Sequence, residues 1–109
     1  MTIEILYVSD CPNYLPTVER VQEALREEQT FADIHHVQVS DGVMATSTRF
    51  LGSPTVRING IDIEPSARSG GDVGMCCRTY RGESGSNGAP SVALIREAIR
   101  ELTTGKDCR

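Results

Sequence analysis

The dipeptide Asn59-Gly60 separates two short apolar runs, Thr55 to Ile58 and Ile61 to Ile63. Both residues accept the positive φ angles of a type I′ turn, so the pattern predicts a β-hairpin with a two-residue loop. The pairing that such a loop imposes puts four apolar side chains on one face of the hairpin, and we expect that face to be buried. The four residues are Val56, Ile58, Ile61 and Ile63.

The rest of the chain alternates between strand and helix patterns. Apolar, β-branched runs predict strands at Thr2 to Val8 and at Ile34 to Val39. Apolar residues spaced three and four apart predict helices at Tyr14 to Glu28 and at Ser91 to Leu102, where Ser91 is a suitable N-cap. A sparser pattern predicts a short helix at Gly42 to Phe50.

The expected fold follows from the order of these elements, which is strand, helix, strand, helix, strand, strand, helix. A right-handed crossover makes the first two strands parallel neighbours. The hairpin then completes a four-stranded mixed sheet with helices on both faces, which is an α/β fold. A chain of 109 residues has the length of a single domain, 1–109.

Two segments lack a periodic pattern. Residues 65–89 hold six of the ten glycines and show no apolar period, which predicts a long Gly-rich loop. A loop of this length in a small domain is usually functional. Residues 103–109 are expected to form a flexible C-terminal tail.

Charge and composition exclude several classes of partner. The net charge of −4 disfavours a nucleic-acid role, because binding to a phosphate backbone needs a concentrated basic surface. No apolar run approaches the roughly 20 residues of a membrane span. We expect no signal peptide, because the first residues carry no basic stretch and lead into a predicted strand. We therefore expect a cytoplasmic protein without a cofactor. In that reducing compartment its four cysteines are expected to be thiols, ligands or redox groups rather than structural disulfides.

Cys11 follows the first predicted strand and precedes the first predicted helix, and Ser53-Pro54 directly precedes the third strand. With these two features, the whole chain resembles the thioredoxin-like superfamily, and more loosely the short bacterial proteins labelled alkylmercury-lyase-like. The thioredoxin-like resemblance implies a reactive cysteine at Cys11 and a cis bond between Ser53 and Pro54. It also implies that the backbone N–H and C=O of Ser53 bind an extended thiol substrate beside Cys11.

The sequence departs from the Cys-x-x-Cys motif of that superfamily, because Tyr14 stands where the second cysteine is expected. This change removes the usual disulfide cycle within the motif. The N-terminus of a helix favours the thiolate of Cys11, whereas the charge of Asp10 disfavours it. Tyr14 is expected to pack against the thiol or to form a hydrogen bond near it.

Cys76 and Cys77 are adjacent in the Gly-rich loop. Adjacent cysteines rarely bond to each other because disulfide geometry is narrow, but two thiolates suit a soft cation. The hairpin returns the chain to the end of the sheet at which Cys11 lies. One of the two cysteines is therefore a candidate for the missing second cysteine.

These residues support three hypotheses of different classes. The first is thiol–disulfide exchange with a protein or a small-molecule thiol or disulfide, in which Cys11 attacks and Cys76 or Cys77 resolves the mixed disulfide. The second is binding of a soft metal or an organomercurial by the same three thiols, with Asp10 as proton donor if a carbon–metal bond is cleaved. The third is a redox-inactive interaction module that uses the fold as a scaffold.

The remaining candidates have simpler interpretations. His35 and His36 are adjacent in a predicted strand and point to opposite faces, so they do not predict a metal site. We expect one of them to be buried and the other exposed. Cys108 is expected to be a free thiol in the tail, and Arg78 and Arg81 are expected to lie on a solvated surface.

Overall fold

A computed structural model describes residues 1–68, 78, 80–82 and 85–104. The elements follow the predicted order of strands and helices, with a 3₁₀ turn and a second pair of strands inserted before the last helix. In chain order they are β1 (Thr2–Tyr7), α1 (Tyr14–Glu27), β2 (Asp33–Gln38), α2 (Gly42–Thr48), β3 (Thr55–Ile58), β4 (Ile61–Asp62), η1 (Pro65–Ala67), β5 (Tyr80–Gly82), β6 (Gly85–Asn87) and α3 (Val92–Thr104).

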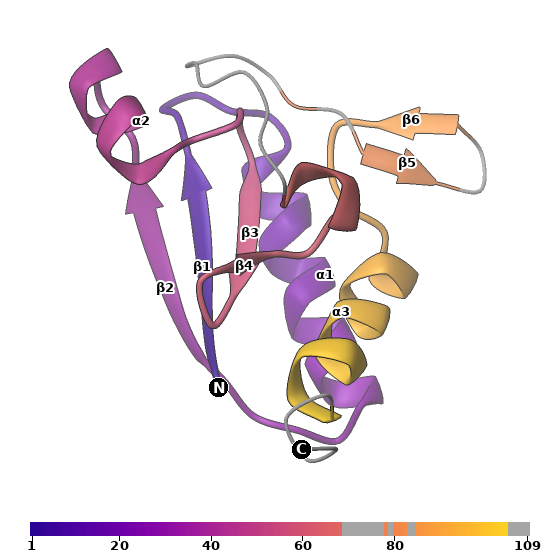
Figure 1. Ribbon diagram of the computed structural model, residues 1–109. Coiled ribbons are helices and arrows are strands. Elements are labelled where there is room, and N and C mark those ends of the chain that lie inside the picture. Colours follow the sequence, from indigo (N-terminus) through magenta and orange to yellow (C-terminus); the bar gives the residue numbers. More distant parts are fainter. Residues whose placement is uncertain (69–77, 79, 83–84, 105–109) are drawn as a thin grey trace.

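The four-stranded sheet is mixed and has the strand order β2-β1-β3-β4 (Figure 1). β1 and β2 are parallel, as the right-handed crossover through α1 predicts. β3 runs antiparallel to β1, with Thr55 opposite Leu6. The end of β1 and the beginning of β3 therefore lie at the same end of the sheet.

Alternation along β1 directs its side chains to two separate cores. Ile3 and Ile5 are fully buried in the larger core, to which α1 and α3 contribute their apolar stripes. Leu6 points to the opposite face and packs with Ala45 of α2 in a smaller core. α1 and α3 thus lie side by side on one face of the sheet (Figure 1), and α2 covers part of the other face. The predicted α/β architecture with a four-stranded mixed sheet is confirmed.

The hairpin between β3 and β4 forms as predicted. Asn59 and Gly60 have φ angles of 53° and 83°, and Ile58 lies opposite Ile61. One expectation about this hairpin is wrong, because Ile61 is 41% exposed. β4 is a two-residue strand at the edge of the sheet, and Ile61 is its first residue after the turn. The core therefore does not extend to this position.

The ends of α2 and α3 differ from the predicted ones by one or two residues. α2 ends at Thr48, because Arg49 adopts the left-handed conformation with a φ of 55°. α3 begins after Ser91, whose hydroxyl accepts a hydrogen bond from the N–H of Leu94 as the N-cap prediction requires. The helix continues to Thr104, so residues 103 and 104 are helical rather than part of a tail. Residues 105–109 lie outside the described part of the chain.

The segment 65–89 was expected to be a loop without regular structure, and the described part of it contains three short elements. η1 follows β4, and β5 and β6 form an antiparallel pair in which Tyr80 lies opposite Asn87. Strands of three residues are too short to produce a detectable apolar period. Tyr80 is only 1% exposed and packs in the larger core, so its side chain helps to attach this segment to the domain.

None of the helices in the described ranges has both the length and the apolar character that crossing a membrane requires.

Candidate functional site

Cys11 lies in the turn between β1 and α1, as predicted, and is partly exposed with a free thiol. α1 begins at Tyr14 with Asn13 as its N-cap, so Cys11 precedes the helix rather than opening it. The C=O of Cys11 accepts a hydrogen bond from the N–H of Tyr14 at 3.3 Å. Asp10 is exposed and has a left-handed backbone with a φ of 63°. The turn therefore presents Cys11 at the surface.

The segment before α3 packs against the beginning of α1. Gly88 lies so close to the Asn13 side chain that a Cβ atom at Gly88 would come within 2.2 Å of the amide nitrogen. Further along the helix, Arg20 donates hydrogen bonds to the backbone carbonyls of Ala89 and Pro90, at 3.3 and 3.1 Å. The turn that carries Cys11 is thus supported by residues from the other end of the chain.

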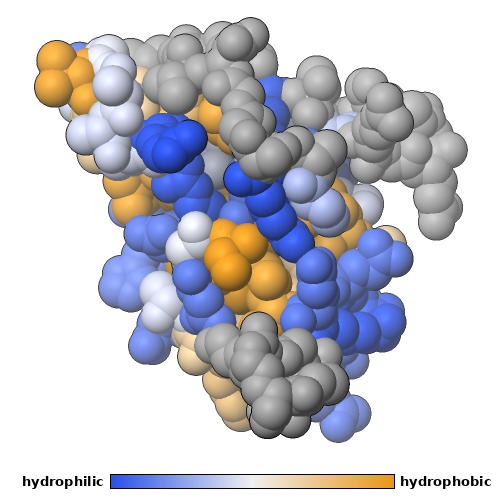
Figure 2. Space-filling model, in the orientation of Figure 1, coloured by the Kyte–Doolittle hydropathy of each residue, from blue (hydrophilic) through white to orange (hydrophobic). Residues whose placement is uncertain are grey.

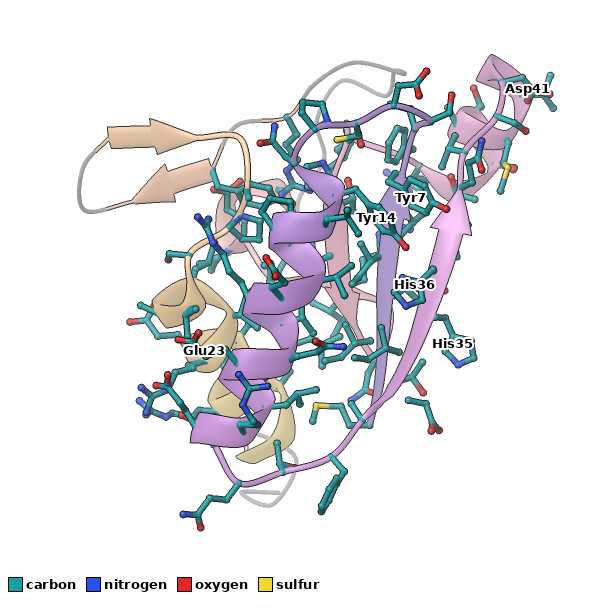
Figure 3. The ribbon with its side chains drawn as sticks, turned by 180° about the vertical axis from the view of Figure 1, so that it is seen from behind. Tyr7, Tyr14, Glu23, His35, His36 and Asp41 are labelled. Carbon is teal, nitrogen blue, oxygen red and sulfur yellow. The ribbon has the colours of Figure 1, made fainter. Side chains whose placement is uncertain are left out.

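Tyr14 makes its side-chain contacts along the sheet (Figure 3). Its ring stacks on that of Tyr7 with 3.8 Å between the centroids, and its hydroxyl forms a hydrogen bond with Nδ1 of His36 at 2.7 Å. Burial and the adjacent Tyr7 raise the pKa of Tyr14 above its ordinary value. Tyr14 therefore fixes the first turn of α1 to β1 and β2.

His35 and His36 are both exposed, so the expectation that one of them is buried is wrong. β2 is the edge strand of the sheet, and its exposed residues include positions on both of its faces. Figure 3 shows the two rings on different sides of the strand, with His36 directed towards Tyr14. The pair does not converge on a common point.

Ser53 and Pro54 lie at the end of the sheet that carries the Cys11 turn. The bond between them is cis, as the sequence resemblance implied. Ser53 is fully buried, and its hydroxyl accepts a hydrogen bond from the N–H of Val8 at 3.1 Å. Its backbone C=O accepts one from the N–H of Arg78 at 2.9 Å. Ser53 therefore connects Val8, which follows β1 and lies three residues before Cys11, with Arg78.

The side chain of Arg78 occupies a buried polar network. Its guanidinium donates to both carboxylate oxygens of Asp62, at 2.7 and 2.8 Å, and to Glu64 at 3.3 Å. It also donates to the Thr55 hydroxyl at 3.2 Å and lies 4.4 Å above the centre of the Tyr80 ring. Arg78 is only 7% exposed. The expectation of a solvated Arg78 is therefore wrong.

This environment determines the ionisation of Arg78 and Tyr80. Burial acts to lower the pKa of Arg78, but the hydrogen bond to Asp62 and the other nearby groups outweigh it, and the pKa rises above its ordinary value. Burial raises the pKa of Tyr80, although the adjacent Arg78 opposes this effect. The phenol stays protonated at neutral pH, and its hydroxyl donates to the C=O of Pro54.

Sequence reasoning missed this network for an identifiable reason. Asp62 lies directly opposite Arg57 across the β3–β4 hairpin, so the sequence pattern alone favours an ion pair between these two residues. In the structure Arg57 instead donates to the backbone C=O of Arg49 at 2.9 Å. Asp62 turns to Arg78, a residue of the Gly-rich segment whose position the sequence does not specify.

Three of the predicted thiols, Cys76, Cys77 and Cys108, lie outside the described residues, as does the side chain of Arg81. Within the described ranges, no cluster of three or more His, Cys, Asp or Glu residues is arranged to hold a metal ion. The described residue that is closest in sequence to Cys77 is Arg78, and its contacts are those given above.

A comparison of the chain with protein-family models, with curated proteins and with solved structures finds no match.

Proposed function

We propose that this protein is a thioredoxin-like thiol–disulfide exchange protein in which Cys11 is the attacking thiol and Cys76 or Cys77 is the resolving thiol. The mixed sheet supports the thioredoxin-like assignment, because β1 leads through the Cys11 turn into α1 while the antiparallel β3 begins beside it, after Pro54. The partial exposure of Cys11 supports its role as the attacking group.

The hydrogen bond from the N–H of Arg78 to the C=O of Ser53 is the observation that carries the proposal. The nitrogen of Arg78 belongs to the peptide bond that links it to Cys77. Ser53 is in turn bonded to Val8, the residue that follows β1. Cys77 and Cys76 directly precede Arg78 in the sequence, and this connectivity supports the choice of one of them as the resolving thiol.

The proposed reaction is a two-step exchange. The thiolate of Cys11 attacks one sulfur of a substrate disulfide, forms a mixed disulfide and releases the other sulfur as a thiolate that takes up a proton. The thiolate of Cys76 or Cys77 then attacks Sγ of Cys11, and the second substrate sulfur leaves as a thiolate. The substrate disulfide gains two electrons, and the two protein thiols become one disulfide.

The soft-metal hypothesis uses the same three thiols as the proposed exchange, and no observation on the described residues favours it over the exchange. The interaction-module hypothesis would be favoured by one large apolar patch. Figure 2 shows an apolar area near the centre of this face, with hydrophilic residues on both sides of it. The large exposed apolar side chains of the described ranges belong to four separate segments: Leu15, Phe31, Val43 and Ile61.

The test uses glutathione disulfide and quenched samples of the reduced protein, analysed by mass spectrometry. The parent chain should pass rapidly through a glutathione adduct at Cys11 to an internal disulfide. The C76S/C77S variant should accumulate the adduct, whereas C108S, the matched control, should behave like the parent. Release of the adduct from C76S/C77S at the parent's rate would refute the resolving role. Adduct formation by C11S at the parent's rate would refute the attacking role.

A further inference from the structure

We infer that Arg78 is a specificity-determining residue, which closes the backbone site at Ser53 to extended peptides and restricts Cys11 to low-molecular-weight disulfides. This inference rests on the proposed function and deepens it by naming the class of substrate. It concerns Ser53 and Pro54, the two residues that directly precede β3, and the described residues that contact them.

The first step is that the backbone of Ser53 and Pro54 is already occupied by the chain itself. The C=O of Ser53 accepts from the N–H of Arg78, and the C=O of the next residue, Pro54, accepts from the hydroxyl of Tyr80. Both Ser53 and Pro54 are buried. An incoming peptide that used these carbonyls would have to displace both donors.

The second step is that Arg78 is held firmly in this position. Its guanidinium forms a two-point ion pair with Asp62 and a further hydrogen bond with Glu64. Moving Arg78 away would separate a buried cation from its carboxylates, which is strongly unfavourable. Binding of a peptide backbone at Ser53 therefore has to compete with this network.

The third step is that Cys11 itself stays accessible while Arg78 is in place. Cys11 is partly exposed, and its neighbour Pro12 is exposed. Leu15, on the first turn of α1, is 68% exposed. A small disulfide needs to reach only the sulfur and does not require hydrogen bonds from Ser53. The geometry thus separates small disulfides from extended ones.

The test compares two probes that release the same chromophore, 2-nitro-5-thiobenzoate, as their leaving thiolate. One probe is its mixed disulfide with 2-mercaptoethanol, and the other is its mixed disulfide with an extended peptide that has one central cysteine. The protein carries C76S, C77S and C108S, so that only Cys11 reacts. Each rate is divided by the rate of the same probe with N-acetylcysteine, which corrects for the probe's own reactivity.

With Arg78 present, the corrected rate should favour the small probe by about tenfold or more, which corresponds to 1.4 kcal/mol. Arg78→Ala keeps the backbone N–H at position 78 but removes the ion pair that holds it against the Ser53 carbonyl. A peptide can then displace this N–H more easily, so the preference should fall by about the same factor. Tyr80→Phe frees only the Pro54 carbonyl and should reduce the preference less. Arg57→Ala, the matched control, replaces an arginine of β3 whose side chain bonds to the Arg49 carbonyl and should leave the preference unchanged.

The possible failures are distinguishable. If Cys11 reacts with the small probe but shows no preference over the peptide, or if R78A and Y80F both keep the parent's preference, the inference is overturned and the proposed function stands. If R78A does not fold, Y80F alone decides: a reduced preference supports the inference, and the parent's preference overturns it. If Cys11 reacts with neither probe, the proposed function fails and the inference fails with it.

Discussion

Arg78 and Asp62 form a two-point ion pair inside the protein, with nitrogen–oxygen distances of 2.7 and 2.8 Å and side chains that are each 6% exposed. The pair connects the β3–β4 hairpin to the residue that directly follows Cys76 and Cys77 in the sequence. Together with the hydrogen bond from the N–H of Arg78 to the C=O of Ser53, the pair fixes Arg78 against the sheet.

Replacing Asp62 by Ala should lower the free energy of unfolding by about 3–5 kcal/mol, because the charge of Arg78 would then be buried without its main partner. Arg57→Ala should lower it by no more than about 0.5 kcal/mol, as expected for a side chain outside the network. Urea unfolding of both variants measures the difference. Equal losses for the two variants would contradict the assignment of Asp62 to Arg78.

Tyr80→Phe removes the hydrogen bond to the Pro54 carbonyl and should cost about 1 kcal/mol. The folded-state pKa of Tyr80 is raised, with burial as the main cause, above its ordinary value of 10.0. The stability contributed by the neutral phenol is therefore complete below pH 10. It is lost as the pH rises towards the pKa that Tyr80 has in the folded state. The parent should lose stability more steeply than Y80F above pH 10 in denaturant titrations. Parallel curves would contradict the burial of the phenol.

Glu28 should control the stability of the α1–α3 pair at acidic pH. Hydrogen bonds from Arg100 and then Arg96 lower its pKa below the ordinary value of 4.5. The contribution of Glu28 to the stability is therefore complete above pH 4.5. It is lost as the pH falls through the lower pKa that Glu28 has in the folded state. Glu28→Gln should flatten the acid side of the pH–stability profile, measured by denaturant unfolding. Glu19→Gln, at an exposed position on the same helix, is the control and should keep the parent's slope. Equal slopes for E28Q and the parent would count against the coupling of Glu28 ionisation to stability.

Gly88→Ala should destabilise the protein by about 1 kcal/mol, because its Cβ atom would overlap the Asn13 amide and the Asn13 side chain would have to move away. In an Asn13→Ala background, the same substitution should cost much less. The double-mutant cycle should therefore give a coupling free energy of at least about 0.5 kcal/mol. Additive losses would show that the contact between Gly88 and the N-terminus of α1 is unimportant.

The fold could largely be predicted from the sequence because its signals are local. Asn59-Gly60 specifies the turn by its backbone angles, and the apolar spacing of the two long helices specifies which face is buried. The position of Cys11 follows from the order of elements, since the turn after β1 leads directly into α1. Each of these inferences uses residues that are close in the sequence or spaced at a regular period.

The rest of the site could not be predicted because it depends on contacts that have no local pattern. The sequence favours Arg57 as the partner of Asp62, and only the three-dimensional arrangement shows that Arg78 takes this place. Tyr80 lies in a segment rich in glycine, where one buried aromatic ring produces no period. Exposure of both His35 and His36 follows from the edge position of β2, which the strand pattern does not specify.

The proposed function requires a loop cysteine to reach Cys11, and disulfide mapping is the most direct measurement of this contact. The reduced protein is treated with a mild oxidant, the remaining thiols are alkylated, and linked peptides are identified by mass spectrometry. The account predicts a link from Cys11 to Cys76 or Cys77 in the parent chain, and its loss in Asp62→Ala under conditions in which that variant is folded. Four alkylated cysteines, or links formed only through Cys108, would contradict it.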